Sequence, residues 1–199
     1  PPATFVTAAG PAVVAALVET CMAPDSKTAP LAADVVAVAR EGLAAVNAMA
    51  RTDRACLNAA VFAANELRPQ LLHLCDALFE GLLAADDAAP GPGRACLDEL
   101  VELVGHFALF DQECVQWGSA SRTTLLHRLL HLPFRYFSAP RHVDALFPTL
   151  AAAIVDNDRN AAAAAEEFSL RAVADYLRQQ IDLAATLAAG DAPPADARH

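Results

Sequence analysis

Apolar residues recur every three or four positions along most of the chain, which is the spacing of an amphipathic α-helix. Pro and Gly clusters, such as Pro90-Gly91-Pro92-Gly93, separate the apolar segments and mark turns. No segment supports a strand, so we expect an all-α protein of about nine helices. The predicted helices are Val13–Met22, Leu31–Ala50, Cys56–Ala64, Leu67–Leu83, Leu97–Leu109, Cys114–Gly118, Thr124–Leu130, Val143–Val155 and Ala161–Leu187.

The predicted helices also repeat along the chain. A shift of 58 residues places Asp53 on Asp111, and a further shift of 47 places Asp111 on Asp158. Each copy has an apolar helix, a polar turn that holds the Asp, a short helix of small residues and a second apolar helix. This plan resembles the armadillo repeat, whose units of about 40 to 47 residues stack into a superhelix because no single unit buries its own apolar face.

We therefore expect a single armadillo-like domain over residues 1–190 and a disordered polar tail over 191–199. The repeats would lie roughly at 31–85, 94–131 and 143–188. The Pro-Pro start and the polar end suggest a fragment of a larger protein. We expect such an array to be a monomer.

Composition narrows the function classes. The chain has 199 residues, is 55% hydrophobic and carries a formal charge of −10, which disfavours broad binding to nucleic acid. Its five cysteines are odd in number and scattered, which is typical of reduced core thiols in a cytoplasmic protein. We expect no apolar run as long as the roughly 20 residues of a membrane span, and therefore no membrane insertion.

One stretch departs from the acidic character of the chain. Cys114 to Val143 holds four Arg and three His and no Asp or Glu. Such a basic stretch is either a surface that binds an acidic partner or a junction between helices whose charges stabilise the fold. We call it the basic island. Within it, Leu132–His142 is expected to form a rigid corner, with Pro133 ending one helix and Pro140 starting the next. The side chains expected to reach an acidic partner are Arg122, Arg128, Arg135, Tyr136 and Arg141.

A second polar cluster, Asp156–Asn160, separates the last two predicted helices. It is interpreted as a turn in which Asp158 or Asn160 caps the following helix. The alternative is that the amides of Asn157 and Asn160 bind the extended backbone of a partner.

Candidate chemistry is sparse. Cys114 with His106, Asp111 and His127 offers the residue types of a thiol nucleophile with its base, but Cys114 occupies a repeat position of small core residues. His127 and His131 are spaced to hold a metal ion from one helix face, yet no third ligand follows at a useful spacing. No phosphate-binding loop is present in the sequence. We expect no enzyme, no cofactor and no metal site.

Several motifs carry a resemblance to a known family. They are Val104-Gly105-His106-Phe107, Gln116-Trp117-Gly118, Leu132-Pro133-Phe134-Arg135-Tyr136-Phe137-Ser138-Ala139-Pro140-Arg141, Ala145-Leu146-Phe147-Pro148-Thr149-Leu150 and Asn157-Asp158-Arg159-Asn160. In this order they resemble the carboxy-terminal region of the S-phase cyclin A-associated protein in the endoplasmic reticulum (SCAPER) family. The match runs from about Arg40 to Gln180, but the family usually has Gln, Asp and Tyr at the positions of Arg135, Ala139 and His106.

The resemblance implies a non-enzymatic adaptor in the cytoplasm, at the periphery of the endoplasmic reticulum. It implies a role in the decay of tubulin messages, with docking to the ribosome and its RNA, to a tetratricopeptide sensor of nascent tubulin and to the deadenylase complex. It also implies association with cyclin A and its kinase. The alternative is an armadillo-like peptide-binding module for a cell-cycle or ciliary partner, without RNA contact.

Overall fold

The computed structural model describes residues 2–22, 31–86, 92–118, 123–133, 136–137 and 140–167, together with residues 178, 181 and 185. The contacts within the chain define two compact units, Pro1–Ala164 and Ala165–His199. The first unit carries the architecture described below. The single domain expected over 1–190 stays a prediction, and the tail expected over 191–199 lies outside the described residues.

The described part of the chain is helical, which confirms the predicted all-α class. Its one β pairing is an isolated bridge between Gly118 and Thr124. Eight α-helices are described, with a π-helix, η2, and a 3-10 helix, η3, between them. The elements are α1 (Pro2–Cys21), α2 (Ala33–Thr52), α3 (Arg54–Leu57), η2 (Asn58–Phe62), α4 (Leu67–Asp86), α5 (Pro92–Phe110), η3 (Gln112–Gln116), α6 (Leu125–Leu130), α8 (Pro140–Ile154) and α9 (Asp158–Glu167).

Helix α1 requires two corrections to the sequence predictions. It begins at Pro2 rather than at Val13, and it continues through Pro11. Its segment Thr4–Cys21 is also long and apolar enough to cross a membrane by length and composition, contrary to the expectation that no run reaches this length. A core helix of a soluble protein meets the same criteria, and α1 buries one face in the core of the first unit. The buried side chains are Val6, Val14, Leu17 and Cys21.

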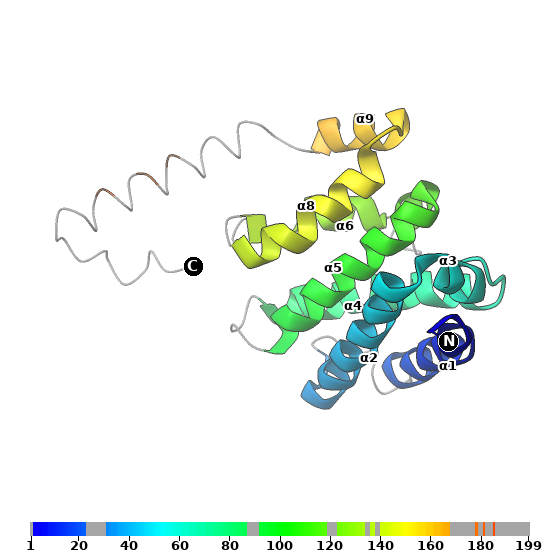
Figure 1. Cartoon of the computed structure of the whole chain (residues 1–199). Coiled ribbons are helices and arrows are strands. Elements are labelled where there is room, and N and C mark those ends of the chain that lie inside the picture. Colours follow the sequence, from blue (N-terminus) through cyan, green and yellow to red (C-terminus); the bar gives the residue numbers. More distant parts are fainter. Residues whose placement is uncertain are drawn as a thin grey trace. The chain divides into compact units, whose positions relative to one another are not determined.

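Helices α2, α5 and α8 form a row in which α5 packs against α2 on one side and α8 on the other (Figure 1). These are the helices that the two sequence shifts place on one another. A shift of 58 carries residues 33–52 onto 91–110, and a shift of 47 carries 92–110 onto 139–157. Helices α1 and α4 pack on the same row and close the apolar core. The order of the row thus follows the order of the sequence copies.

Two of the repeated aspartates have the same local role. Asp53 and Asp111 are extended residues with φ of −151° and −150°, and each one precedes a short helix. The carboxylate of Asp53 accepts the backbone N–H of Cys56 at 3.0 Å, and that of Asp111 accepts the N–H of Glu113 at 3.0 Å. Such N-caps satisfy donors that the first helical turn leaves unpaired. The shared cap therefore fixes the same turn in the first two copies.

A close contact joins α5 and α8. The Thr149 hydroxyl donates a hydrogen bond of 2.9 Å to the Val101 carbonyl oxygen, one turn before Gly105. A Cβ atom at Gly105 would lie 2.4 Å from Thr149 Oγ1 and 3.2 Å from Thr149 Cα. The absence of a side chain at Gly105 is therefore what allows α8 to approach α5 this closely.

Candidate functional site

The structure turns Arg128 inward, which corrects its predicted place at a partner surface. Its Nε donates a hydrogen bond of 2.6 Å to Oδ1 of Asp76 on α4, and a second guanidinium nitrogen lies 3.8 Å from Glu80. The side chains of Arg128 and Asp76 are 12% and 6% exposed. Arg128, a member of the basic island, is therefore paired with acidic residues of the same chain.

Tyr136 is also buried, whereas the sequence analysis placed it outward. The residue is 2% exposed, and its hydroxyl donates a hydrogen bond of 2.5 Å to Asp98 Oδ1 on α5. Phe137, the next residue, packs against the core. The ring of Tyr136 is therefore part of the fold and does not stack on a partner from the outside.

The remaining basic candidates lie where the structure gives no side-chain contacts. Arg122 and Arg135 fall outside the described residues. Arg141 lies in the first turn of α8, and its side chain is not described. The partner-binding role of these three arginines stays a prediction.

The Asn157–Asn160 pair works as an internal connection. Asn157 Oδ1 accepts the backbone N–H of Asn160 at 3.0 Å, so Asn157 caps α9 instead of Asp158 or Asn160. Asn160 is fully buried, and its amide donates to the carbonyl oxygens of Ala153 at 2.7 Å and Gln112 at 3.2 Å. An amide that is bonded in this way has no donor left for a partner's backbone, which corrects the alternative proposed for Asn160.

The candidate nucleophile Cys114 lies in the core. It is 2% exposed, and burial raises the pKa of its thiol far above the usual range. Asp111 forms an ion pair with Arg68, and no hydrogen bond joins Cys114 to His106 or His127 in the described part of the chain. The reactive form of a cysteine is the thiolate. The structure therefore places Cys114 as a neutral core residue.

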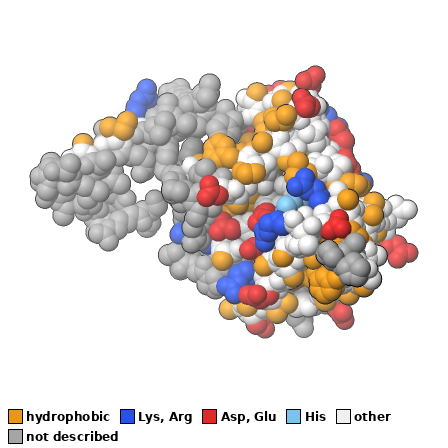
Figure 2. Space-filling model, viewed as in Figure 1, with side chains coloured by type: hydrophobic (Ala, Val, Ile, Leu, Met, Phe, Trp, Pro, Cys, Tyr) orange, Lys and Arg blue, Asp and Glu red, His pale blue; other side chains and the backbone are white. Residues whose placement is uncertain are grey.

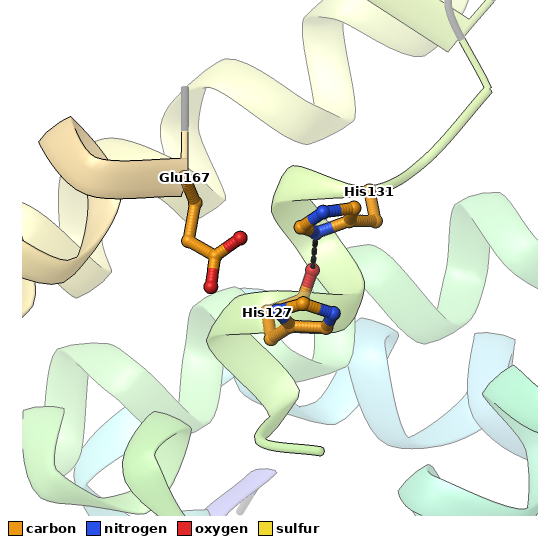
Figure 3. Close-up of side chains that lie close together, drawn as sticks. All are labelled: His127, His131 and Glu167. Carbon is orange, nitrogen blue, oxygen red and sulfur yellow. Dashed lines mark hydrogen bonds between the residues drawn. The ribbon is translucent and has the colours of Figure 1, made fainter. Parts of the chain in front are cut away.

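The two histidines of α6 lie against each other (Figure 3). The ring centroids of His127 and His131 are 3.8 Å apart, and His131 Nδ1 donates a hydrogen bond of 2.9 Å to the His127 carbonyl oxygen. This bond fixes the proton of His131 on Nδ1. Glu167, which Figure 3 also draws, belongs to the second compact unit, so within the first unit these histidines are a pair.

An open groove lies over the row of helices, and we call it the α5–α8 groove. Its volume is about 500 Å³, and its walls come from α3, α5 and α8. Figure 2 shows acidic, basic and histidine side chains gathered on the face over α5. The lining residues are Arg54, Asp98, Glu99, Glu102, Gly105, His106, Leu109, Asp144, Ala145, Pro148 and Thr149.

His106 forms part of the floor of the groove. It is 9% exposed, and its Nε2 lies 3.3 Å from Oε1 of Glu102, one turn earlier on α5. Burial lowers the pKa of His106, and the neighbouring Glu102 opposes this effect without cancelling it. A neutral imidazole donates to a carboxylate from Nε2, which leaves the Nδ1 lone pair as an acceptor. Nδ1 is buried and has no hydrogen-bond partner in the structure.

We expect His106 to make stability depend on pH. Its pKa is lower in the folded chain than the value of about 6.5 of an unfolded histidine, so the unfolded chain binds the proton more readily. The free energy of unfolding should therefore fall as the pH drops below about 6.5. Urea denaturation between pH 5.5 and 7.5 should show a smaller decrease for His106→Gln than for the unchanged chain. An identical decrease in both proteins would contradict this expectation.

The sequence analysis missed the groove as a site, although a signal was present. Asp98, Glu102 and His106 stand four residues apart on α5, which places them on one face of the helix. As candidate chemistry, His106 was considered only in a group with Cys114, Asp111 and His127. The contribution of Asp144 from α8 depends on how two helices pack, and a periodic pattern does not reveal that.

Comparisons with known proteins give one partial similarity. No protein-family model matches the chain. The chain is similar to the human protein named S phase cyclin A-associated protein in the endoplasmic reticulum, with 36% identity over 96 residues. The matched segment covers 47% of this chain and 6% of that protein. The chain thus spans a small part of the length of the curated relative that it matches.

Proposed function

We propose that the chain is a non-enzymatic adaptor domain, an armadillo-like helical array that binds other proteins. The observation that carries this proposal is the row α2, α5 and α8, whose order follows the internal repeat and which leaves the α5–α8 groove open. Arrays of this kind stack repeated helices into an extended surface that partners use.

The chemistry of the candidate residues supports a binding role over catalysis. Cys114 is a buried thiol with a raised pKa, and Asp111 is held by Arg68. His106 contacts Glu102 and not the thiol. No nucleophile with an adjacent base is formed by these residues, which is the arrangement that covalent catalysis needs.

The similarity to the cyclin A-associated protein suggests the setting of this adaptor. We place it in the cytoplasm at the periphery of the endoplasmic reticulum, as a monomer that is not inserted into the membrane. There it would join ribosomes translating tubulin, contact a tetratricopeptide sensor of the nascent chain and bring in the deadenylase complex. The motifs from Gly105 to Asn160 support this assignment, because they are the sharpest part of the resemblance.

Ribosome co-sedimentation tests the adaptor role. Changing Arg135 and Arg141 together to Glu should reduce the fraction that sediments with ribosomes translating tubulin, because the change reverses the charge of the basic corner. Circular dichroism and the melting temperature should stay as in the unchanged chain. Arg159→Glu serves as a control, because Arg159 is an exposed arginine outside the basic island, paired with Glu113. Loss of folding in the double variant, or no sedimentation of the unchanged chain, would argue against the proposal.

A second candidate is a peptide-binding module for cyclin A or another cell-cycle partner, without contact to RNA. The inward positions of Arg128 and Tyr136 favour it, since they remove two members of the expected basic surface. The dependence of binding on salt concentration distinguishes the two candidate functions. Binding to ribosomal RNA should weaken steeply between low and physiological salt, because counterions are released, whereas a groove held by amide hydrogen bonds should change little.

A further inference from the structure

The α5–α8 groove has an acidic end. Four carboxylates line it, and Arg54 is the one basic side chain among the lining residues. Glu99 receives its hydrogen bond from the neutral amide of Asn47 at 2.8 Å, and Asp144 is an exposed carboxylate on α8. Neither Glu99 nor Asp144 forms an ion pair with a described basic residue. The carboxylates of Glu99 and Asp144, in the first halves of α5 and α8, are therefore not neutralised by an ion pair with a described basic residue.

His106 provides a second and independent indication of a ligand. It is nine-tenths buried in the floor of this groove, and its Nδ1 acceptor has no partner. A buried acceptor without a hydrogen bond is unfavourable, so a ligand N–H that reaches it would be favourable. The carboxylates give the groove charged acceptors, and the unpartnered Nδ1 of His106 is a neutral acceptor buried beneath them, so a ligand that supplies donors suits this site.

The opposite end of the groove is basic, because it holds Arg54. Arg54 lies at the start of α3, close enough to His106 for its charge to lower the pKa of that histidine, and Leu109 follows His106 by three residues on α5. Between Asp98 and Leu109 a helix rises about 16 Å, at about 1.5 Å per residue. An extended peptide covers that length with about five residues at about 3.3 Å each. The groove therefore has the length of a short segment, with an acidic end and a basic end.

We propose that the α5–α8 groove binds an extended segment of a partner protein, with arginine at the Glu99–Asp144 end and an acidic residue at Arg54. A guanidinium has five donors in a planar fork, which suits a site made of carboxylates and an imidazole acceptor. This inference rests on the proposed adaptor function and specifies the partner that one surface of the adaptor accepts.

Fluorescence anisotropy with a labelled peptide, Arg-Ala-Arg-Ala-Glu amide, tests the proposal at physiological salt. The peptide should bind more tightly than the same peptide with citrulline in place of arginine, which keeps the shape and removes the charge. Asp144→Asn should weaken binding about threefold, and the addition of Glu99→Gln should bring the loss to about tenfold, as expected for partly exposed charge pairs. Gln at position 99 keeps the oxygen that accepts from Asn47.

The matched control is Asp156→Asn, the same change at an exposed aspartate of the turn before α9. Asp156 has φ of 61°, a conformation that asparagine adopts readily, so this variant should fold and bind the peptide like the unchanged chain. Equal weakening by Asp144→Asn and Asp156→Asn would mean that net charge alone attracts the peptide and would overturn the proposal. Equal binding of the citrulline peptide would also overturn it, while ribosome co-sedimentation would still report on the adaptor function.

Discussion

Replacing Arg128 with methionine should lower the free energy of unfolding by about 3–5 kcal/mol, because it leaves a buried carboxylate without its partner. Arg128 and Asp76 join α6 to α4, and both side chains are almost fully removed from water. Methionine keeps much of the side-chain volume, so the loss reports the charge pair and not a cavity. Urea denaturation followed by circular dichroism at pH 7 measures the change.

Two further variants identify the origin of this loss. Arg159→Met removes an exposed arginine from its pair with Glu113, and it should cost at most about 1 kcal/mol. Combining Arg128→Met with Asp76→Leu removes both buried charges and should restore a large part of the lost stability. If Arg128→Met behaved like Arg159→Met, the pair with Asp76 would not stabilise the fold, and Arg128 would be available to an external partner.

The helices and their order were predictable from the sequence because they depend on local patterns. The spacing of apolar residues predicts α2 and α4 closely, and it predicts α5 except for its first five residues, since each of these helices buries one face in the core. The shift that aligns Asp53 with Asp111 also predicts a shared turn, and both residues cap short helices. Such features need only the neighbouring residues, so one sequence is sufficient to find them.

The roles of individual polar side chains were not predictable in the same way. The basic island from Cys114 to Val143 contains no acidic residue, so its charges were assigned to an outside partner. Asp76 lies 52 residues before Arg128, and Asp98 lies 38 residues before Tyr136. Which distant helix packs against the island is decided by tertiary contacts. A local excess of charge therefore does not distinguish a binding surface from an internal junction.

The same limit explains the α5–α8 groove and α1. The groove takes residues from α3, α5 and α8, and its shape depends on how closely two helices approach. Helix α1 was predicted to begin at Val13, two residues after Pro11, and a proline inside a helix removes one of its hydrogen bonds. Its N-terminal part is nevertheless helical, and Val6 is buried against the rest of the unit. Tertiary packing outweighs local preference at both places.

The close approach of α5 and α8 leads to the second large expected effect, which is the loss caused by Gly105→Ala. The added methyl group would meet Thr149 Oγ1 at 2.4 Å and the Thr149 backbone at 3.2 Å. Thr149 is held by its hydrogen bond to Val101, so it cannot turn away without losing that bond. Overpacking of this kind costs about 1–3 kcal/mol, more than the approximately 1 kcal/mol that alanine gains over glycine inside a helix.

Gly93→Ala is the matched control for this prediction, because Gly93 lies in the same helix. A Cβ atom there would contact Leu82 Cδ2 at 3.7 Å, an ordinary van der Waals distance. Gly93→Ala should therefore leave the free energy of unfolding unchanged or raise it slightly, whereas Gly105→Ala should lower it and also weaken peptide binding, because α8 forms one wall of the groove. Equal stability of the two variants in urea denaturation would show that α8 moves away from α5 without cost, and the α5–α8 groove would then not be a rigid site.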